Sequence, residues 1–312
     1  VVACGTAYYA GLIGKHLIEK VCRIPVVSEV ASEFRYKDPI LDDRTLLIVV
    51  SQSGETADTL EALRIAKRSG ARVLAVVNAV GSSIAREADD VFYILAGPEI
   101  AVASTKAYSA QVAAMYILTC HIAVAIGKMS KDEFKAVKEE LYTIPGKIEY
   151  ILQKESVEKR LAEKYKGVRN VFYIGRGLDY LVSQEGSLKL KEIAYLHSEA
   201  YAAGELKHGP IAMIDENTLV VAIAVQEELI EKTISNIKEV KARGAKVMAI
   251  AMKGNTKIAD VADDVIYIPR TMGLLAPVLA NIPNQLFAYY MALNLGTDID
   301  KPRNLAKSVT VE

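Results

Sequence analysis

Short runs of β-branched and aliphatic residues alternate with segments of helical periodicity along most of the chain. The runs predict strands at Val1–Ala3, Thr45–Val50, Arg72–Val77, Val91–Ile94, Asn170–Ile174, Thr218–Val225, Lys246–Ala251 and Val265–Ile268. Amphipathic stretches such as Asp58–Ser69 and Ile230–Arg243 predict helices between them. Because the strands are apolar without interruption and helices separate them, we expect parallel sheets covered on both faces. The apolar stretch Ala110–Ile126 is interrupted by Gln111 and His121, so we expect a buried helix there and no membrane span.

The two halves of the chain repeat each other over several elements. SGARVLAVVN at 69–78 matches RGAKVMAIAM at 243–252, and ADDVFYIL at 88–95 matches ADDVIYIP at 262–269 with the same spacing. TLLIVVSQ at 45–52 matches TLVVAIAV at 218–225, with a spacing between the two copies that is shorter by one residue. So constant an offset indicates a gene duplication. We therefore predict an α/β fold with two tandem, doubly wound domains at 1–130 and 167–297, a helical connection at 131–166, and an ordered C-terminal tail at 298–312.

Composition narrows the class of protein without identifying it. Acidic and basic side chains balance at 38 each, so no general field attracts nucleic acid or an anionic membrane, and a small anion must be bound by local chemistry. Three cysteines without a CxxC spacing argue against a disulfide framework or a structural zinc site and favour a reducing cytoplasm. The chain opens on VVACGT without a methionine or a signal peptide, so we expect a domain taken from a longer polypeptide.

The segment SQSGET, which follows the second predicted strand, is the best candidate for binding an anion. It supplies hydroxyl and amide groups from Ser51, Gln52, Ser53 and Thr56. Parallel sheets bind ligands beyond the carboxyl ends of their strands, and the free N–H groups at a helix start attract anions. The same hydroxyls could equally cap the helix, and we expect that capping role to persist. The duplicate favours the anion site, because the matching place reads VQEE, where Glu227 and Glu228 would repel phosphate.

Two other strand-to-helix segments of the first half add polar groups at the same expected edge of the sheet. In CGT, Thr6 offers a hydroxyl, whereas Cys4 has no evident base nearby and is expected to be a small core residue. In AVASTK, Ser104 is either a ligand contact or a helix cap, and the sequence favours the cap.

The second half carries acid–base groups in place of hydroxyls. Within EGSLKLKE, Glu185, Lys189 and Glu192 are spaced i, i+4 and i+7, so they share one face of a helix. They form either an exposed salt-bridged stripe, which is the commoner arrangement, or a partly buried site for proton transfer. His208 lies in the loop KHGP, and its imidazole titrates near neutrality, which suits proton transfer during ring opening.

The C-terminal segment PRNLAKSVTVE follows the last predicted helix, where chains usually fray. Leu305, Val309 and Val311 are nevertheless apolar enough to dock on the protein. A docked tail would bring Lys307 into a site as an amine nucleophile, a role that residue chemistry alone does not favour.

The motifs ACGT, ASEFRY, SQSGETADTL, AVASTKA, EGSLKLKE, EAYAAGELKHGP and PRNLAKSVTVE, in this order, resemble the glucosamine-6-phosphate synthases along the whole chain. The resemblance is to their carboxyl-terminal isomerase half, which consists of two flavodoxin-like sugar-isomerase (SIS) domains. It implies sugar-phosphate contacts at Thr6, Ser51, Gln52, Ser53, Thr56, Val102, Ser104 and Ala306. It also implies catalytic roles, which are a Schiff base at Lys307, ring opening by His208, proton transfer by Glu192, and support from Glu185 and Lys189.

The resemblance further implies an activity and partners. The ligands would be fructose-6-phosphate, glucose-6-phosphate and the product glucosamine-6-phosphate, in the cytoplasmic synthesis of amino sugars and UDP-GlcNAc precursors. A homodimer is implied in which the His208 loop is lent across subunits; no metal, other cofactor, nucleic acid or membrane is implied. The glutaminase domain of these enzymes is missing from the chain, so we expect isomerisation, with amination only from free ammonia. Ala7 departs from the serine that some members carry after CGT.

Two other functions remain open at the level of sequence. One is a related SIS deglycase or sugar-phosphate deaminase–isomerase, against which PRNLAKSVTVE and KHGP argue. The other is a noncatalytic sugar-phosphate sensor, which would need SQSGET but would have no use for Glu192, His208 and Lys307 together.

Overall fold

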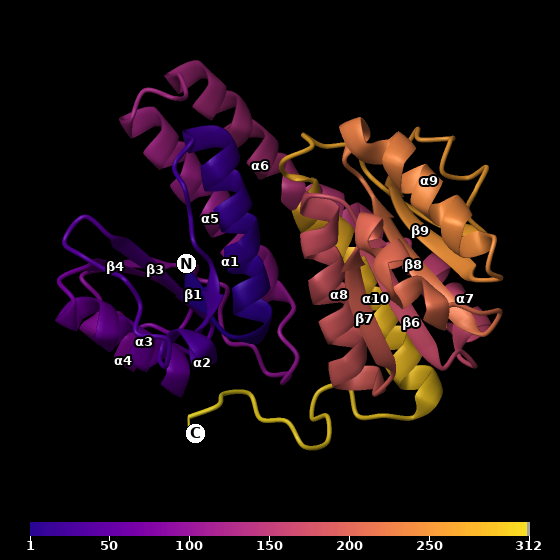
Figure 1. Cartoon of the computed structure of the whole chain (residues 1–312), viewed down its shortest axis with the longest axis horizontal. Coiled ribbons are helices and arrows are strands. Elements are labelled where there is room, and N and C mark those ends of the chain that lie inside the picture. The colour runs from indigo at the N-terminus through magenta and orange to yellow at the C-terminus, as the bar shows by residue number, and fades with distance from the viewer. Residues whose placement is uncertain (311–312) are drawn as a thin grey trace. The chain divides into compact units, whose positions relative to one another are not determined.

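The computed structural model describes residues 1–310 and divides the chain into two compact units. The first unit comprises Val1–Lys138 together with the C-terminal segment from Asn304 onward, and the second comprises Glu139–Arg303. Val311, expected above to help dock the tail, and Glu312 lie outside the described residues. Each unit is built on one parallel sheet flanked by helices, which confirms the predicted α/β fold class (Figure 1).

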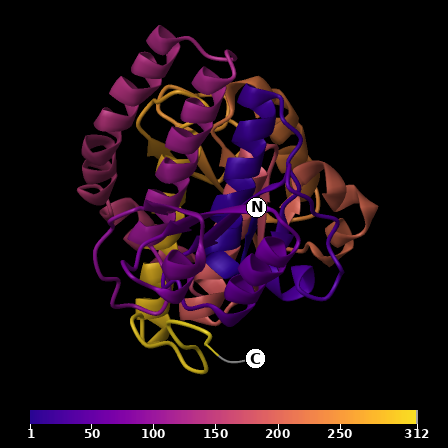
Figure 2. The same cartoon turned by 90° about the vertical axis from the view of Figure 1, so that its left-hand side faces the viewer.

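The first unit contains five parallel strands in the order β2-β1-β3-β4-β5. These strands are β1 (Val2–Ala3), β2 (Glu29–Val30), β3 (Leu46–Ser51), β4 (Arg72–Val77) and β5 (Asp90–Tyr93). The helices are α1 (Gly5–Leu17), extended by a π-helical turn at Ile18–Cys22, α2 (Ala31–Phe34), α3 (Ala57–Arg68), α4 (Ser83–Glu87) and α5 (Lys106–Ala125). α1 and α5 run side by side (Figure 2). They approach closely because Gly14 faces Met115, whose Sδ would lie 2.6 Å from any added Cβ.

Side chains along β3 alternate between two apolar cores, one on each face of the first sheet. Leu47 and Val49 belong to the core that includes residues of α3 and α4, whereas Ile48 and Val50 belong to the core that includes residues of α5. All four are at most 4% exposed. This alternation is the two-residue period of a strand, and full burial of each such side chain contributes about 1.5–3 kcal/mol.

Helix α5 is long and apolar enough, by length and composition alone, to cross a membrane. A single helix of this kind is weak evidence for a span, because core helices of globular proteins pass the same test. Ala114, Met115 and Ala123 of α5 belong to one of the two cores of the first unit. The buried helix predicted at Ala110–Ile126 is therefore confirmed as a core helix.

The second unit contains five parallel strands in the order β10-β9-β8-β6-β7. These strands are β6 (Asn170–Gly175), β7 (His197–Ala202), β8 (Thr218–Ala224), β9 (Lys246–Met252) and β10 (Asp264–Ile268). The α-helices are α7 (Ser156–Tyr165), α8 (Leu178–Ala194), α9 (Ile230–Lys241) and α10 (Ala276–Leu295), and 3₁₀ turns η2, η3 and η4 cover Ala203–His208, Pro210–Met213 and Glu227–Leu229. Gly186 lets α8 pack against α10, because a Cβ there would lie 2.8 Å from Asn284 Nδ2.

The strand register reproduces the internal repeat. The pairing of β3 with β4 begins at Leu46↔Arg72, and that of β8 with β9 begins at Leu219↔Lys246. The repeat in the sequence aligns the same residues, Leu46 with Leu219 and Arg72 with Lys246. The strand order of the second sheet, read from β7 to β10, is that of the first sheet read from β2 to β5. The two units are therefore copies of one fold, as the offsets in the sequence predicted.

Each sheet has one strand more than the four predicted from the sequence, so that part of the prediction is wrong. The additional strands, β2 and β7, both lie at an edge of their sheet. β2 has only two residues, and β7 has the sequence HSEAYA, in which polar and apolar residues mix. An edge strand pairs on one side only and needs no continuous apolar run, which was the signal used to find strands.

The predicted helical connection at 131–166 consists of α6 (Lys131–Leu152) and α7. The boundary between the two units falls within α6, after Lys138. Most α6 side chains are exposed, and Ile144 and Ile151 are the ones it buries. The exact limits of the predicted domains stay a prediction.

Candidate active site

The loop SQSGET turns sharply between β3 and α3, and Gly54 makes that turn possible. Gly54 has a φ of +67°, and a Cβ there would lie 2.0 Å from Ser82 Oγ. Its carbonyl oxygen accepts a hydrogen bond from the Ile84 N–H at 3.0 Å, which fixes the loop to the start of α4. Only glycine combines the left-handed backbone with the space available here.

The hydroxyl groups of SQSGET gather around the first turn of α3. Ser51 Oγ accepts the Gly54 N–H at 2.9 Å and lies 3.4 Å from Thr56 Oγ1, and Ser53 Oγ accepts the Glu55 N–H at 3.2 Å. The carboxylate of Glu55 is occupied elsewhere, because its Oε1 accepts the Ser83 N–H at 2.8 Å, and this bond lowers the pKa of Glu55. Hydroxyls next to a helix N-terminus are a suitable environment for a phosphate-sized anion.

The prediction that a hydroxyl of this loop caps α3 is wrong. Thr56 is the residue that precedes the helix, but its side chain makes no capping hydrogen bond. The first N–H of the helix, that of Ala57, instead donates to the carbonyl oxygen of Val309 at 3.1 Å. The C-terminal segment thus supplies the cap and leaves the loop hydroxyls available.

The C-terminal segment is held on the first unit by polar contacts. Ser308 Oγ donates to Ser53 Oγ at 3.0 Å, in addition to the bond between Val309 and Ala57. The predicted docking through apolar side chains is wrong for the described residues, because Leu305 is 46% exposed and Val309 is 57% exposed. The tail is held by hydrogen bonds of its backbone and hydroxyl groups, which the pattern of apolar residues in the sequence does not predict.

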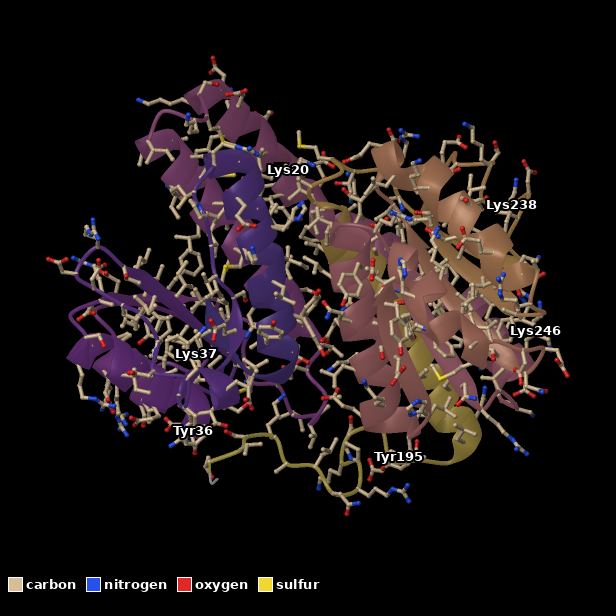
Figure 3. All side chains as sticks on the ribbon, viewed as in Figure 1. Lys20, Tyr36, Lys37, Tyr195, Lys238 and Lys246 are labelled. Carbon is tan, nitrogen blue, oxygen red and sulfur yellow. The ribbon has the colours of Figure 1, made fainter. Side chains whose placement is uncertain are left out.

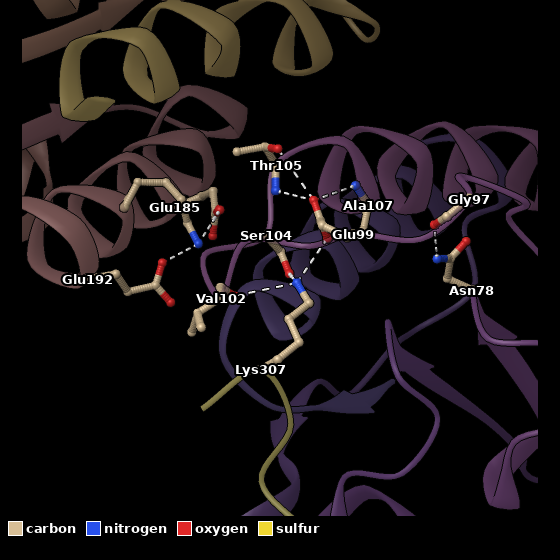
Figure 4. Close-up of polar contacts among 11 residues, drawn as sticks. Asn78, Gly97, Glu99, Val102, Ser104, Thr105, Ala107, Glu185, Glu192 and Lys307 are labelled. Atoms are coloured by element: carbon tan, nitrogen blue, oxygen red, sulfur yellow. Dashed lines mark hydrogen bonds and ion pairs between the residues drawn. The ribbon is translucent and has the colours of Figure 1, made fainter. Parts of the chain in front are cut away.

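Lys307 points from this segment towards the loop that precedes α5 (Figure 4). Its Nζ lies 3.2 Å from Ser104 Oγ, 3.4 Å from the Val102 carbonyl oxygen and 3.3 Å from Glu99 Oε2. The Lys307 side chain is 25% exposed and that of Glu99 only 4%. Oxygen atoms from one loop therefore surround an amine that is distant from them in sequence.

Glu99 is a candidate functional residue that sequence reasoning missed. Its Oε1 accepts the N–H groups of Thr105 at 2.7 Å and Ala107 at 3.5 Å at the start of α5, while its Oε2 faces Lys307. Burial alone would raise the pKa of Glu99, but the Thr105 N–H and the Lys307 charge outweigh it and lower the pKa. Glu99 also replaces Ser104 as the group that caps α5, so the predicted Ser104 cap is wrong.

The loop that carries Glu99 is itself fixed to the sheet. Asn78, which directly follows β4, donates from Nδ2 to the Gly97 carbonyl oxygen (Figure 4) and accepts the Ala96 N–H, both at 2.8 Å. A carboxylate in a long loop before a helix was the only signal in the sequence that could have singled out Glu99. The Thr105 N–H and the Lys307 amine become neighbours of Glu99 only in the folded unit.

The remaining predicted residues of the first unit have varied positions. Thr6 is half-buried in the first turn of α1, and Gln52 is half-buried, with its backbone oxygen accepting the Ala79 N–H at 3.2 Å. Ala306 is exposed beside Lys307. Cys4 packs against the core, and burial raises the pKa of its thiol, which agrees with the structural role expected for it.

The second unit buries the charged face of α8. Glu185 and Lys189 are 0% and 1% exposed, and Glu192 is 20% exposed. Lys189 Nζ lies 3.4 Å from Glu185 Oε1 and also bonds to Glu192 Oε2. The alternative of an exposed salt-bridged stripe is therefore wrong. Burial alone would lower the pKa of Lys189, but the two carboxylates outweigh it and raise the pKa, so the lysine stays charged.

His208 stands apart from the other predicted residues of its unit. It ends the 3₁₀ turn η2 and is exposed, and Gly209 follows it with a φ of +148°. Within residues 1–310 the structure provides no group of three or more His, Cys, Asp or Glu side chains arranged to hold a metal ion.

The chain leaves the second unit through a contact at the end of α8. Tyr195, labelled in Figure 3, accepts the Arg303 N–H at 2.7 Å, and the Arg303 guanidinium lies 4.4 Å from the centre of its ring. Thr297 Oγ1 donates to the Ile193 carbonyl oxygen at 2.5 Å. These bonds fix the residues that precede the segment carrying Lys307.

Comparison with known proteins identifies the class of the fold. A family model described as SIS domain matches residues 1–120 and 164–295, one match in each unit. The chain is thus a tandem SIS-domain protein. Among solved structures, the C-terminal domain of glucosamine-fructose-6-phosphate aminotransferase from Francisella tularensis is 41% identical, with a TM-score of 0.93, over 96% of this chain and 85% of that chain.

Curated relatives define the family more narrowly. The glutamine–fructose-6-phosphate aminotransferases (isomerizing) of Clostridium tetani and Thermus thermophilus are 61% and 54% identical to the whole chain. The chain covers 51% and 52% of their length, so it spans about half of the curated relatives it matches. The chain belongs to the glutamine–fructose-6-phosphate aminotransferase family and corresponds to its C-terminal isomerase half. A glucosamine-6-phosphate deaminase from Thermotoga maritima is 26% identical, with a TM-score of 0.81, over 99% of this chain and 89% of that chain.

Proposed function

We propose that this chain binds fructose-6-phosphate and carries out the ketose–aldose isomerisation that leads to glucosamine-6-phosphate. The observation that carries the proposal is the position of Lys307. Its amine reaches Ser104 and Val102, while the next residue, Ser308, bonds to Ser53 of SQSGET. One short segment therefore connects an amine nucleophile to the hydroxyls suited to an anion.

The first step is to fix the sugar by its phosphate. The hydroxyls of Ser51, Ser53 and Thr56 and the start of α3 would bind the phosphate group, and Gln52 and Thr6 would add polar contacts. Binding one end of a flexible sugar chain places its carbonyl carbon near Lys307, which lowers the entropic barrier of every later step. Val102, Ser104 and Ala306 would line the sugar itself.

The second step is chemical. The Lys307 amine, once deprotonated, adds to the ketose carbonyl carbon, and loss of water gives a Schiff base. Addition of ammonia to this imine and loss of the Lys307 amine leave a charged imine of the sugar itself. This imine acidifies the neighbouring C–H, so a carboxylate can take the proton from C1 and return it to C2 while the nitrogen stays on C2. Without ammonia, water hydrolyses the Schiff base, and the same proton transfer on the open-chain ketose gives the aldose. Glu192 is the proposed carboxylate, because it is the most exposed of Glu185, Lys189 and Glu192 and bonds to a charged Lys189. Glu185 is the second carboxylate that contacts Lys189 and keeps it charged.

Glu99 adds a function that the family resemblance did not include. Its carboxylate lies 3.3 Å from Lys307 Nζ, and the two charges hold the amine in position beside Ser104 before the amine loses its proton and attacks. Its bond to the Thr105 N–H keeps it oriented while the ligand changes.

We further propose the setting of this activity. The chain would act in the cytoplasm, as part of a homodimer in which His208 of one subunit assists ring opening in the other, and beside a glutaminase domain that supplies ammonia. Support comes from the exposure of His208 and from the matched relatives, which are about twice as long as this chain.

Reductive trapping tests the proposal. Borohydride added with fructose-6-phosphate should reduce a Schiff base and leave a hexitol phosphate adduct on Lys307, located by peptide mass spectrometry. Lys307→Ala should abolish the adduct, whereas Lys301→Ala, at an exposed lysine that precedes this segment, should leave it unchanged. An adduct at another lysine, or none at all, would refute the role of Lys307.

A second candidate is deamination of glucosamine-6-phosphate, which the similarity to the Thermotoga maritima protein favours. The two functions differ in a direct assay of the chain. The isomerase proposal expects faster interconversion of fructose-6-phosphate and glucose-6-phosphate than release of ammonia from glucosamine-6-phosphate. The reverse order of rates would support the deaminase, and tight fructose-6-phosphate binding without either reaction would indicate a sensor.

A further inference from the structure

The turn between β8 and α9 is the counterpart of SQSGET in the second unit. Strand register matches Ser51 with Ala224, because these residues pair with Val77 and Ala251 at the ends of corresponding strands. Val225 and Gln226 consequently occupy the places of Gln52 and Ser53. By the same alignment, the start of α9 at Ile230 matches the start of α3 at Ala57. The turn of the second unit therefore lies between the two corresponding elements, and has the same number of residues, as SQSGET in the first unit.

A carboxylate from another helix fills this position. Asp179, in the first turn of α8, is 0% exposed, and its Oδ2 accepts the N–H groups of Val225 at 3.0 Å and Gln226 at 3.2 Å. Gly175 allows this close approach, because a Cβ there would lie 2.4 Å from the Asp179 carbonyl carbon. The arrangement is a buried carboxyl group that accepts two consecutive backbone N–H groups before a helix. Burial raises the pKa of Asp179 to about 7, although the Gln226 and Val225 N–H groups oppose this shift.

The first unit has no such carboxylate at the corresponding place. β1 pairs with β3 at Val2↔Val49, and β6 pairs with β8 at Ile174↔Ala222, so Val2 corresponds to Ile174. Counted forward from these two residues, Ala7 is the counterpart of Asp179. Because the methyl group of Ala7 accepts no hydrogen bond, no side chain at this place competes with a ligand for the N–H groups of Gln52 and Ser53.

We infer that the Asp179 carboxyl group occupies the second unit's counterpart of the phosphate loop, so that the β8–α9 turn excludes a second sugar phosphate. The inference goes beyond the proposed function, which concerns the loop of the first unit. It also assigns a cause to the asymmetry of the repeat. Glu227 stands where Gly54 makes the turn in the first unit, and a glutamate is tolerated there because it begins the 3₁₀ turn η4 and has no positive φ.

Titration of the unmodified chain with inorganic phosphate provides the first test. Amide resonances of Val225 and Gln226 should stay unchanged up to saturation of the first unit, while those of Gln52 and Ser53 shift. Shifts of Val225 and Gln226 at the same phosphate concentrations would overturn the inference. If no amide of either unit responds, the proposed phosphate site fails, whereas exclusion from the second unit still holds.

Chemical rescue provides the second test. At pH 8, above the raised pKa of about 7, Asp179→Ala should lower the midpoint of thermal unfolding by about 4–8 °C, because two charge-assisted hydrogen bonds are lost. Sodium formate, a carboxylate small enough for the vacated space, should restore at least half of that loss, and sodium chloride at equal ionic strength should not. Asp179→Asn keeps an acceptor oxygen and is the matched control, expected to show no response to formate.

A folded Asp179→Ala chain that responds equally to formate and chloride would overturn the inference. If that variant does not fold, the phosphate titration of the unmodified chain decides the question, because it requires no substitution.

Discussion

Gly54 illustrates how a single residue fixes the candidate phosphate loop. Its left-handed backbone conformation and the 2.0 Å approach to Ser82 act independently, since one concerns the backbone and the other a neighbouring side chain. Gly70 shares the positive φ, at +82°, but has open space where a Cβ would lie. The two glycines therefore separate the cost of the backbone conformation from the cost of a steric clash.

Gly54→Ala should lower the free energy of unfolding by about 2–4 kcal/mol, and Gly70→Ala by about 1 kcal/mol. The difference is the overpacking against Ser82. Urea unfolding of the three chains measures it. Equal losses for the two variants would mean that Ser82 moves aside without cost, and would remove the steric argument for glycine in SQSGET.

Glu99 has a lowered pKa, so its contribution to stability has a defined pH dependence. The contribution is fully present above the unfolded pKa, near 4.5, and is lost as the pH falls through the lower folded value. Glu99→Gln should therefore be less stable than the unchanged chain at pH 7, by about 1–2 kcal/mol, and the difference should shrink towards zero in strong acid. Denaturant unfolding across this range measures it. Glu33→Gln, at an exposed position of α2, is the control, and a constant difference for Glu99→Gln would contradict the assignment.

At the scale of elements, α8 combines a buried charged face with close packing against its neighbours. Its charged face is buried, and Lys189 contacts two carboxylates there. Its start supplies Asp179 to the β8–α9 turn, and its close packing on α10 depends on Gly186. The helix has only a weak separation of polar and apolar faces because neighbouring elements surround it on several sides.

Lys189→Met should be strongly destabilising, because Glu185 would remain as a buried charge without its cation. Breaking a buried ion pair in this way costs about 3–5 kcal/mol. Lys191→Met, at an exposed position of the same helix, should change stability by less than about 0.5 kcal/mol. Similar midpoints of thermal unfolding for the two variants would show that α8 tolerates the unpaired charge.

At the scale of the whole molecule, the duplication has produced units with different chemistry. The first unit presents hydroxyls and a lysine amine, and the second presents buried acid–base groups, with its own carboxylate in the matching loop. The proposed reaction needs both sets of groups. If His208 acts across a dimer, each site also needs two chains.

Mixing variants tests that requirement. His208→Ala and Lys307→Ala chains should each be inactive in isomerisation alone, whereas subunit exchange between them should restore about a quarter of the unchanged activity, because half of the dimers then carry one intact site of two. Activity in mixtures before and after exchange measures this. No recovery, despite exchange shown by mass spectrometry, would place both residues in the same subunit's site.

Much of the fold could be predicted from the sequence. The offsets of the sequence repeat reappear in the strand register, because a duplicated fold keeps its buried strands in place. SQSGET was recognisable because its hydroxyl groups lie between a buried strand and a helix. Comparison of the two halves of the sequence showed that the matching loop has changed to VQEE. Strands β2 and β7 escaped because edge strands need no apolar run.

Only the tertiary structure decided which groups meet. The sequence by itself determined two parallel α/β units, the loop SQSGET and the charged spacing on α8, because these depend on local periodicity and on comparison of the two halves. It did not determine the burial of that charged face, the cap that Val309 provides for α3, or the pairing of Glu99 with Lys307. Each of these depends on groups or elements that are distant in sequence. Such contacts form when the chain packs, and local sequence patterns do not predict them.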